Sequence, residues 1–128
     1  MLGAMKRVRR MLRAPFLSSA QAVELRGATL FDPPFLDGAI VGTERAFDGM
    51  VAIYDYERLV SIYAREFACE VEHEGEEWEM AMEWVDYNTL GVMPSIGSRK
   101  PVVVRAVERG ERGSRLVEIK GIRYQRVA

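Results

Sequence analysis

Carboxylates and a lone histidine are the side chains of this sequence whose types and spacing could most directly do chemistry. The segment Glu70–Glu79 holds six glutamates around His73, the one histidine of the chain. Carboxylate oxygens bind hard cations, and an imidazole adds affinity for transition metals. The spacing matches no known metal-binding loop, however, and glutamates at the start of a helix are usually solvated. We therefore predict neither a metal site nor a cofactor here.

A second combination is a pair of carboxylates for acid–base catalysis, drawn from Asp55, Glu83 and Asp86. Asp55 has a sufficient structural role as a helix cap. Asp86 and Asn88 lie near the expected end of a helix, where the helix dipole disfavours a carboxylate. A locally unfavourable residue sometimes marks a functional site, but these residues form no complete catalytic set, and we assign no catalytic residue. A small metal-dependent or acid–base enzyme would need Asp55, His73 and Asp86 to converge.

Two further combinations favour ordinary structural interpretations. Cys69 could act as a nucleophile only with a nearby base such as His73, and the surrounding acidic side chains disfavour a thiolate. The loop from Gly91 to Gly97 precedes Arg99 and Lys100 and could cradle a phosphate with its backbone N–H groups. It lacks the spacing of a phosphate-binding Walker loop, so we interpret it as a helix-to-strand connection.

Composition limits the class of protein. The chain has 128 residues, of which 48% are hydrophobic and 29% are charged, as in one globular domain. The single cysteine excludes an intrachain disulfide framework and a multi-cysteine zinc site. No apolar run approaches the roughly 18–20 residues that a membrane span requires, so we expect a cytoplasmic protein.

Charge is segregated along the chain, although the net charge is only −1. Residues 1–31 hold six basic side chains and one acidic one, and residues 99–128 hold nine basic and three acidic ones. Residues 32–98 hold three basic and fifteen acidic side chains. Such asymmetry either indicates a surface for an oppositely charged partner or is neutralised within the fold or an oligomer.

We predict that residues 1–26 form a basic N-terminal arm and that residues 27–128 form a single α+β domain. Apolar residues recur at helical spacing from Met5 to Leu12, and Pro15 would end such a helix near Arg13. The arm is compatible with docking on nucleic acid or on an anionic membrane surface, with a transit peptide, or with a disordered leader. It lacks the apolar core of a secretory signal.

The middle of the chain predicts a hairpin followed by two helices. We interpret residues 27–38 as a loop, 39–43 and 50–54 as strands, and Asp48-Gly49 as the hairpin signal between them. Asp55 is a candidate N-cap for a helix whose core face includes Leu59, Val60 and Tyr63. A second helix should start near residues 74–76, bury Trp78, Ala81, Met82 and Val85, and close at Gly91 in a left-handed conformation.

The C-terminal part supplies two more strands: one at 101–104 and, after a turn at 108–113, one at 116–120, to which residues 122–127 could also contribute. The order is therefore β-β-α-α-β-β. We expect a mainly antiparallel sheet with two helices packed on one face, which is an α+β fold. The helical spacing of the tyrosines and tryptophans favours core packing over a stacking platform.

Four segments carry a resemblance: Asp37–Gly42, Tyr54–Glu57, Ala81–Gly91 and Pro101–Val104. Together they are similar to the core of a family of small uncharacterised proteins from phages and other mobile elements. The resemblance covers roughly half of the chain. The segment from Ala68 to Trp78 departs from the family pattern, which has a shorter helix–helix turn there. The resemblance implies an architecture and a phage-type genetic context, without an established chemistry.

The favoured hypothesis is a non-enzymatic binding or inhibitory protein of phage type, whose acidic helical face occupies a basic surface of a host protein. The contacts expected for it are Glu72, Glu74, Glu76, Glu77 and Glu79. The alternative is an accessory protein that binds nucleic acid through its basic ends. Its expected contacts are Lys6, Arg7, Arg9, Arg10, Arg13, Arg123 and Arg126. The small enzyme described above is the second alternative. The sequence leaves the oligomeric state open.

Overall fold

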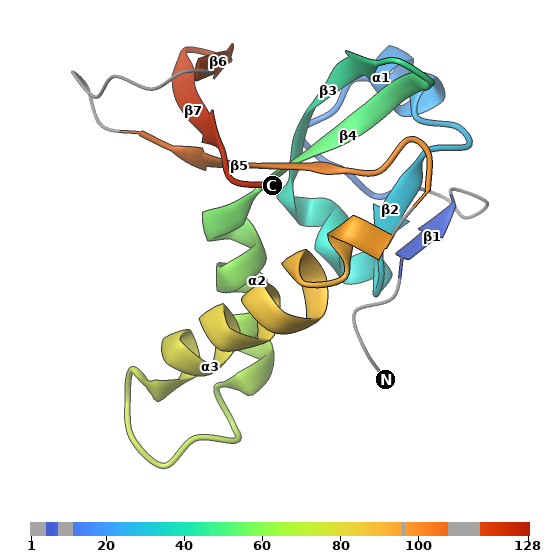
Figure 1. The fold of residues 1–128 in the computed structure, drawn as a ribbon. Helices are drawn as coiled ribbons and strands as arrows, with labels where there is room; N and C mark the ends of the chain where they lie inside the picture. Colours follow the sequence, from blue (N-terminus) through green and yellow to red (C-terminus); the bar gives the residue numbers. More distant parts are fainter. Residues whose placement is uncertain (1–4, 8–11, 96, 108–115) are drawn as a thin grey trace.

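The computed structural model describes residues 5–7, 12–95, 97–107 and 116–128 (Figure 1). Seven strands, three α-helices and three helical turns of other types follow one another along these residues. In chain order they are β1 (Met5–Arg7), α1 (Ser19–Glu24), β2 (Thr29–Phe31), the 3-10 helix η1 (Pro34–Ala39), β3 (Ile40–Ala46), β4 (Gly49–Asp55), α2 (Tyr56–Phe67), α3 (Glu76–Trp84), the π-helix η2 (Val85–Leu90), the 3-10 turn η3 (Met93–Ser95), β5 (Val102–Ala106), β6 (Leu116–Ile119) and β7 (Ile122–Arg126).

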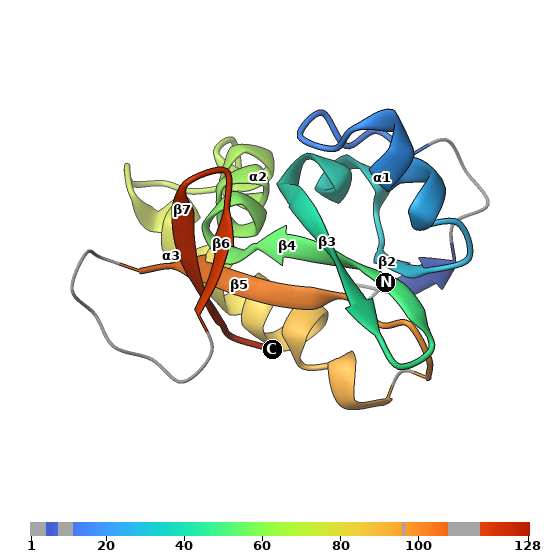
Figure 2. The same ribbon diagram turned by 90° about the horizontal axis from the view of Figure 1, so that it is seen from above.

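The larger sheet has five strands in the order β3-β4-β5-β7-β6 and is curled (Figures 1 and 2). Its pairs are antiparallel except β4 and β5, which run parallel. Parallel neighbours need a long crossover connection, and α2 and α3 occur within it. The two helices pack against the sheet, so the predicted α+β class with a mainly antiparallel sheet is confirmed.

The hairpin of β3 and β4 lies where the sequence predicts it, with its turn shifted by one residue. Ala46 pairs with Gly49, so Phe47 and Asp48 form the two-residue turn. Gly49 has a φ of 134°, a conformation that L side chains rarely adopt. The glycine therefore begins the second strand, where its conformational freedom is required.

Helix α2 also matches its prediction. The Asp55 carboxylate accepts a hydrogen bond of 3.3 Å from the backbone N–H of Arg58 and caps the helix. Tyr56, Leu59, Val60, Tyr63 and Ala64 are buried, as expected for apolar residues three and four positions apart.

The sheet buries side chains on both faces. On β4, Ala52 and Tyr54 belong to the core that packs under the helices, whereas Val51 and Ile53 belong to a second core. Val103 of β5 likewise joins the first core and its two neighbours the second, because successive side chains point to opposite faces. The curl of the sheet encloses the second core.

Three details of the helical layer differ from the sequence prediction. Trp78 and Met82 are each 46% exposed, and Ala81 is the buried side chain of α3. The last predicted turn is a π-helix instead of an α-helix. Gly91 adopts right-handed helical angles, not left-handed ones, and is required for space: a Cβ there would collide with the backbone carbonyl oxygen of Tyr87.

The N-terminal part contributes more structure than predicted. Met5–Arg7 form a strand paired with β2, so the helix expected over these residues is wrong. The segment 27–38, interpreted as a loop, contains β2 and most of η1. Helix α1 was not expected. Leu25 is fully buried in the first core, and Leu12 and Leu17 pack against it. The turn predicted at 108–113 lies outside the described residues. Among those described, no helix combines the length and hydrophobicity needed to cross a membrane.

Candidate functional site

The acidic segment lies at the outer end of the α2–α3 hairpin, away from the sheet (Figure 1). Five glutamates predicted as partner contacts occupy the connecting loop and the first turn of α3, and we call them the acidic tip: Glu72, Glu74, Glu76, Glu77 and Glu79. Negative charge is favourable at this helix start because the helix dipole is positive there. Gly75, with a φ of 97°, precedes α3, and its N–H donates to the Glu77 carboxylate at 3.2 Å.

The acidic tip has no basic side chain paired with it in the part of the chain that the structure describes. Glu72, Glu74 and Glu79 are exposed, and Glu76 and Glu77 are half-buried. Within the described residues, none of the five carboxylates forms an ion pair with a basic side chain. By contrast, Asp55 pairs with Arg58 at 3.8 Å and Glu57 pairs with Arg105 at 3.0 Å. Both acidic residues lie at the start of α2, at the other end of the hairpin.

A groove of about 510 Å³ lies beside the acidic tip, between the end of α2, the middle of α3 and η2. Its lining combines aromatic and apolar side chains with two carboxylates and one amide: Phe67, Glu70, Met80, Glu83, Trp84, Tyr87 and Asn88. Tyr87 is 83% exposed, which differs from the core packing that its helical spacing predicts. The stripe of Met80, Trp84 and Tyr87, next to the buried positions Ala81 and Val85, is the sequence signal for this groove.

The floor of the groove belongs to a continuous aromatic cluster. The ring centroid of Tyr63 lies 5.8 Å from that of Phe35, 5.9 Å from that of Phe67 and 6.0 Å from that of Trp84. Phe67 and Trp84 meet edge to face at 5.8 Å. Burial raises the pKa of Tyr63. These contacts hold Phe67 and Trp84 in place, so the floor is preorganised.

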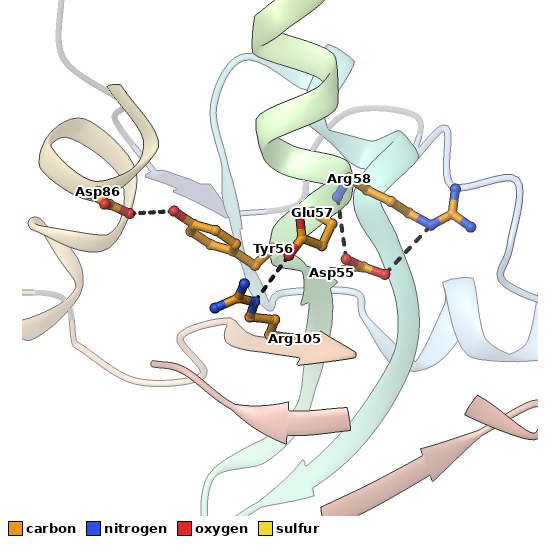
Figure 3. Close-up of polar contacts among 6 residues, drawn as sticks. All are labelled: Asp55, Tyr56, Glu57, Arg58, Asp86 and Arg105. Carbon is orange, nitrogen blue, oxygen red and sulfur yellow. Dashed lines mark hydrogen bonds and ion pairs between the residues drawn. The ribbon is translucent and has the colours of Figure 1, made fainter. Parts of the chain in front are cut away.

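The π-helix η2 is anchored through Asp86. The Tyr56 hydroxyl donates a 2.8 Å hydrogen bond to the Asp86 carboxylate (Figure 3). The pKa of Tyr56 is raised to about 12, first by burial and then by the hydrogen bond to Asp86 and the negative charge of its carboxylate. Asp86, whose position near a helix end is electrostatically unfavourable, thus has a structural partner. π-Helical turns are rare and frequently occur at functional sites.

The three residues that an acid–base enzyme would need are not brought together. Figure 3 shows Asp55 and Asp86 on opposite sides of Tyr56, with their carboxylates directed at different partners. His73 is exposed in the loop beyond the far end of α2, whose 12 residues span about 18 Å. No group of three potential metal ligands occurs among the described residues. Cys69 is exposed in the same loop.

The side chain of Arg99, considered above for phosphate binding, is used in hydrogen bonds within the protein. Its guanidinium donates hydrogen bonds to the backbone oxygens of Met50 at 2.9 and 3.0 Å, Arg26 at 2.8 Å and Glu24 at 3.1 Å. Its own N–H donates to the Asp48 carboxylate at 2.7 Å. The side chain therefore joins the end of α1 to β4, and the backbone N–H of Arg99 contacts the hairpin turn, so the connection before β5 is a structural one.

The basic residues predicted to contact nucleic acid are distributed over separate elements. Lys6 and Arg7 belong to β1, and Arg9 and Arg10 lie outside the described residues. Arg13 is exposed. Arg123 and Arg126 are exposed on β7, where their odd spacing places them on opposite faces of the strand.

One of these residues adjoins a second hollow, of about 430 Å³, at the tip of the β3–β4 hairpin. Arg126 lines it together with Arg45 and Lys100. Phe47, which also lines the hollow, is fully exposed in the hairpin turn. The acidic Glu44 and Asp48 contribute to the same lining.

Comparison with known protein families, with curated proteins and with solved structures finds no match to this chain.

Proposed function

We propose that the chain is a non-enzymatic binding protein of phage type, which uses the acidic tip to occupy a basic surface of a host protein in the host cytoplasm. The observation that carries this proposal is that Glu72, Glu74, Glu76, Glu77 and Glu79 have no ion-pair partner within the described residues. A basic protein surface supplies the missing positive charge. Binding by occlusion needs no catalytic group, in keeping with the separation of Asp55, His73 and Asp86.

Charge complementarity predicts how binding to the partner depends on salt. Charges on an exposed tip mainly steer the encounter, so the association rate and affinity should fall as salt is added. Capture from a lysate of the host, followed by binding measurements on the purified partner, gives the test. The double substitution Glu76→Lys with Glu77→Lys should weaken binding about tenfold or more at low salt.

A matched control has the same change in net charge at exposed sites far from the tip, with Glu24→Lys and Glu118→Lys. This control should bind with nearly unchanged affinity. A partner whose affinity responds equally to both double substitutions, or to neither, contradicts the proposal.

A second candidate function, nucleic-acid binding, is supported by the hollow at the β3–β4 hairpin tip. Arg45, Lys100 and Arg126 could neutralise phosphates there, and Phe47 offers an exposed ring for base stacking. Binding of a labelled single-stranded oligonucleotide to the full chain tests it. Phe47→Ala and Arg126→Ala should each weaken binding several-fold, whereas Arg123→Ala, on the opposite face of β7, should have less effect.

A further inference from the structure

The groove between α2, α3 and η2 exposes aromatic surface that the fold leaves uncovered. Phe67 and Trp84 form its floor, Met80 is 37% exposed and Tyr87 is 83% exposed. Exposed apolar surface of this kind is unfavourable in water unless another molecule covers it. The aromatic contacts beneath the floor keep its shape fixed, so a ligand would find the rings already in position.

The charge of the groove restricts what can cover it. Glu70, in the connection three residues after the end of α2, and Glu83 of α3 both contribute to the lining, and both are exposed. Of the residues that the structure describes, no basic one lines the groove and none forms an ion pair with either carboxylate. An anionic ligand would therefore be repelled, and a purely apolar one would leave the carboxylates without a counter-charge.

A ligand with a cationic head and an apolar stem satisfies both requirements. Cations are attracted to the faces of tryptophan and tyrosine rings, and the methylene stem of a basic side chain covers apolar surface. A guanidinium fits better than an ammonium, because it stacks on aromatic rings and donates paired hydrogen bonds to a carboxylate. We propose that this groove is the anchor site for an arginine side chain in a basic segment of a partner protein.

The anchor site rests on the function proposed above. It adds a second contribution to the binding energy, beside that of the acidic tip. Glu70, which lines the groove, is only two residues before Glu72 of the acidic tip. One basic segment of a partner can therefore contact the groove and the tip together. The exposed glutamates of the tip steer the approach of the partner, whereas a side chain held between rings and carboxylates slows its departure. The anchor should therefore be less sensitive to salt than the tip.

The test uses the full chain and a fluorescent nine-residue peptide, a threefold repeat of Arg-Leu-Gly. A second peptide carries citrulline, which keeps the shape of arginine without its charge, and a third carries lysine. Fluorescence anisotropy gives the affinities at low and at moderate salt. We expect the citrulline peptide to lose most of the binding and the lysine peptide to bind several-fold more weakly than the arginine peptide.

Variants separate the anchor from the tip. Tyr87→Ala should weaken arginine-peptide binding about five- to tenfold, and Tyr87→Phe should keep it, because the ring face is retained. Glu70→Gln with Glu83→Gln should weaken binding more than Glu24→Gln with Glu118→Gln, which removes the same charge elsewhere. The resonances of Trp84 and Tyr87 should shift in NMR spectra on addition of the peptide.

The outcomes distinguish the two proposals. If Tyr87→Ala binds as the natural chain does while Glu76→Lys with Glu77→Lys weakens binding, the anchor is wrong and the acidic tip stands. If Tyr87→Ala weakens binding and reversal of Glu76 and Glu77 has no effect, the anchor stands and the acidic tip is wrong. Equal binding of the arginine and citrulline peptides, or no binding of the arginine peptide, overturns the anchor.

Discussion

The Tyr56 hydroxyl donates a hydrogen bond of 2.8 Å to the Asp86 carboxylate, and this contact fastens the first residue of α2 to the π-helix η2. The two residues are separated by 30 positions in the chain. Because η2 also carries Tyr87 and Asn88, the bond helps to set the position of one wall of the groove. Stability and groove geometry are thus linked through this pair.

Removal of the Tyr56 hydroxyl should destabilise the protein. Tyr56→Phe keeps the buried ring and leaves the Asp86 carboxylate without its donor, which should lower the free energy of unfolding by about 1–2 kcal/mol. Urea denaturation followed by circular dichroism measures this difference. Tyr87→Phe, which removes a hydroxyl from an exposed ring, should leave the unfolding free energy nearly unchanged. Equal stabilities of the Tyr56→Phe variant and the natural chain would show that the bond contributes little.

The same pair should give the protein a pH-dependent stability in alkaline solution. Burial raises the pKa of Tyr56 from its usual 10.0 to about 12. A phenol that is harder to ionise in the folded state stabilises the fold below pH 10, and this contribution is lost as the pH rises from 10 to 12. The stability advantage of the natural chain over Tyr56→Phe should therefore shrink across this range. Urea denaturation of both proteins, at neutral pH and at pH about 11, checks this, and a constant difference would contradict it.

Arg99 should be a major determinant of stability. Three backbone oxygens, of Glu24, Arg26 and Met50, accept hydrogen bonds from one guanidinium. Arg99→Lys keeps the charge but cannot reproduce this planar array of donors, so we expect a loss of about 2–3 kcal/mol in unfolding free energy. Thermal and urea denaturation provide the measurement. Lys100→Ala, at the adjacent exposed position, is the control and should change stability by less than about 0.5 kcal/mol.

Gly91→Ala should destabilise the protein although its backbone angles are helical. A glycine-to-alanine substitution in a helical conformation usually stabilises by about 0.5–1 kcal/mol. Here a Cβ would collide with the carbonyl oxygen of Tyr87, so the sign should reverse. Gly97→Ala is the matched control, because a Cβ at Gly97 meets no atom within 4 Å. A melting temperature of Gly91→Ala at or above that of the natural chain would show that η2 can relax.

Removal of the N-cap of α2 should lower the unfolding free energy by less than the Arg99 substitution does. Asp55→Ala removes the acceptor for the Arg58 N–H and should lower the unfolding free energy by about 1 kcal/mol. Asp55→Asn keeps a capping oxygen and should lie close to the natural chain in urea denaturation. If the asparagine variant is as unstable as the alanine variant, the negative charge of Asp55 matters more than its hydrogen bond.

Local signals in the sequence were sufficient for the elements whose stability is mainly local. Asp55 and the apolar spacing behind it predict α2, and Asp48-Gly49 predicts the β3–β4 hairpin to within one residue. The three consecutive β-branched valines at 102–104 predict a central strand, and all three are buried. Helix α1 also had a readable signal, since Ser18 and Gln21 form a capping box with two reciprocal hydrogen bonds.

Contacts between residues distant in the chain decided the structure of β1, of η2 and of the groove. Apolar residues from Met5 to Leu12 have helical spacing, but Met5–Arg7 form a strand because β2 supplies backbone hydrogen-bond partners, with Lys6 opposite Leu30, 24 residues away. The sequence also predicts an ordinary helix end at residues 85–91, where the structure has a π-helix that is hydrogen-bonded to Tyr56 and an exposed Tyr87.

The sequence by itself determined the class of fold and the concentration of glutamates between α2 and α3. Only the tertiary structure placed Phe67, at the end of α2, beside Trp84 of α3 and Tyr87 of η2, because such proximity depends on how distant elements pack and not on local periodicity.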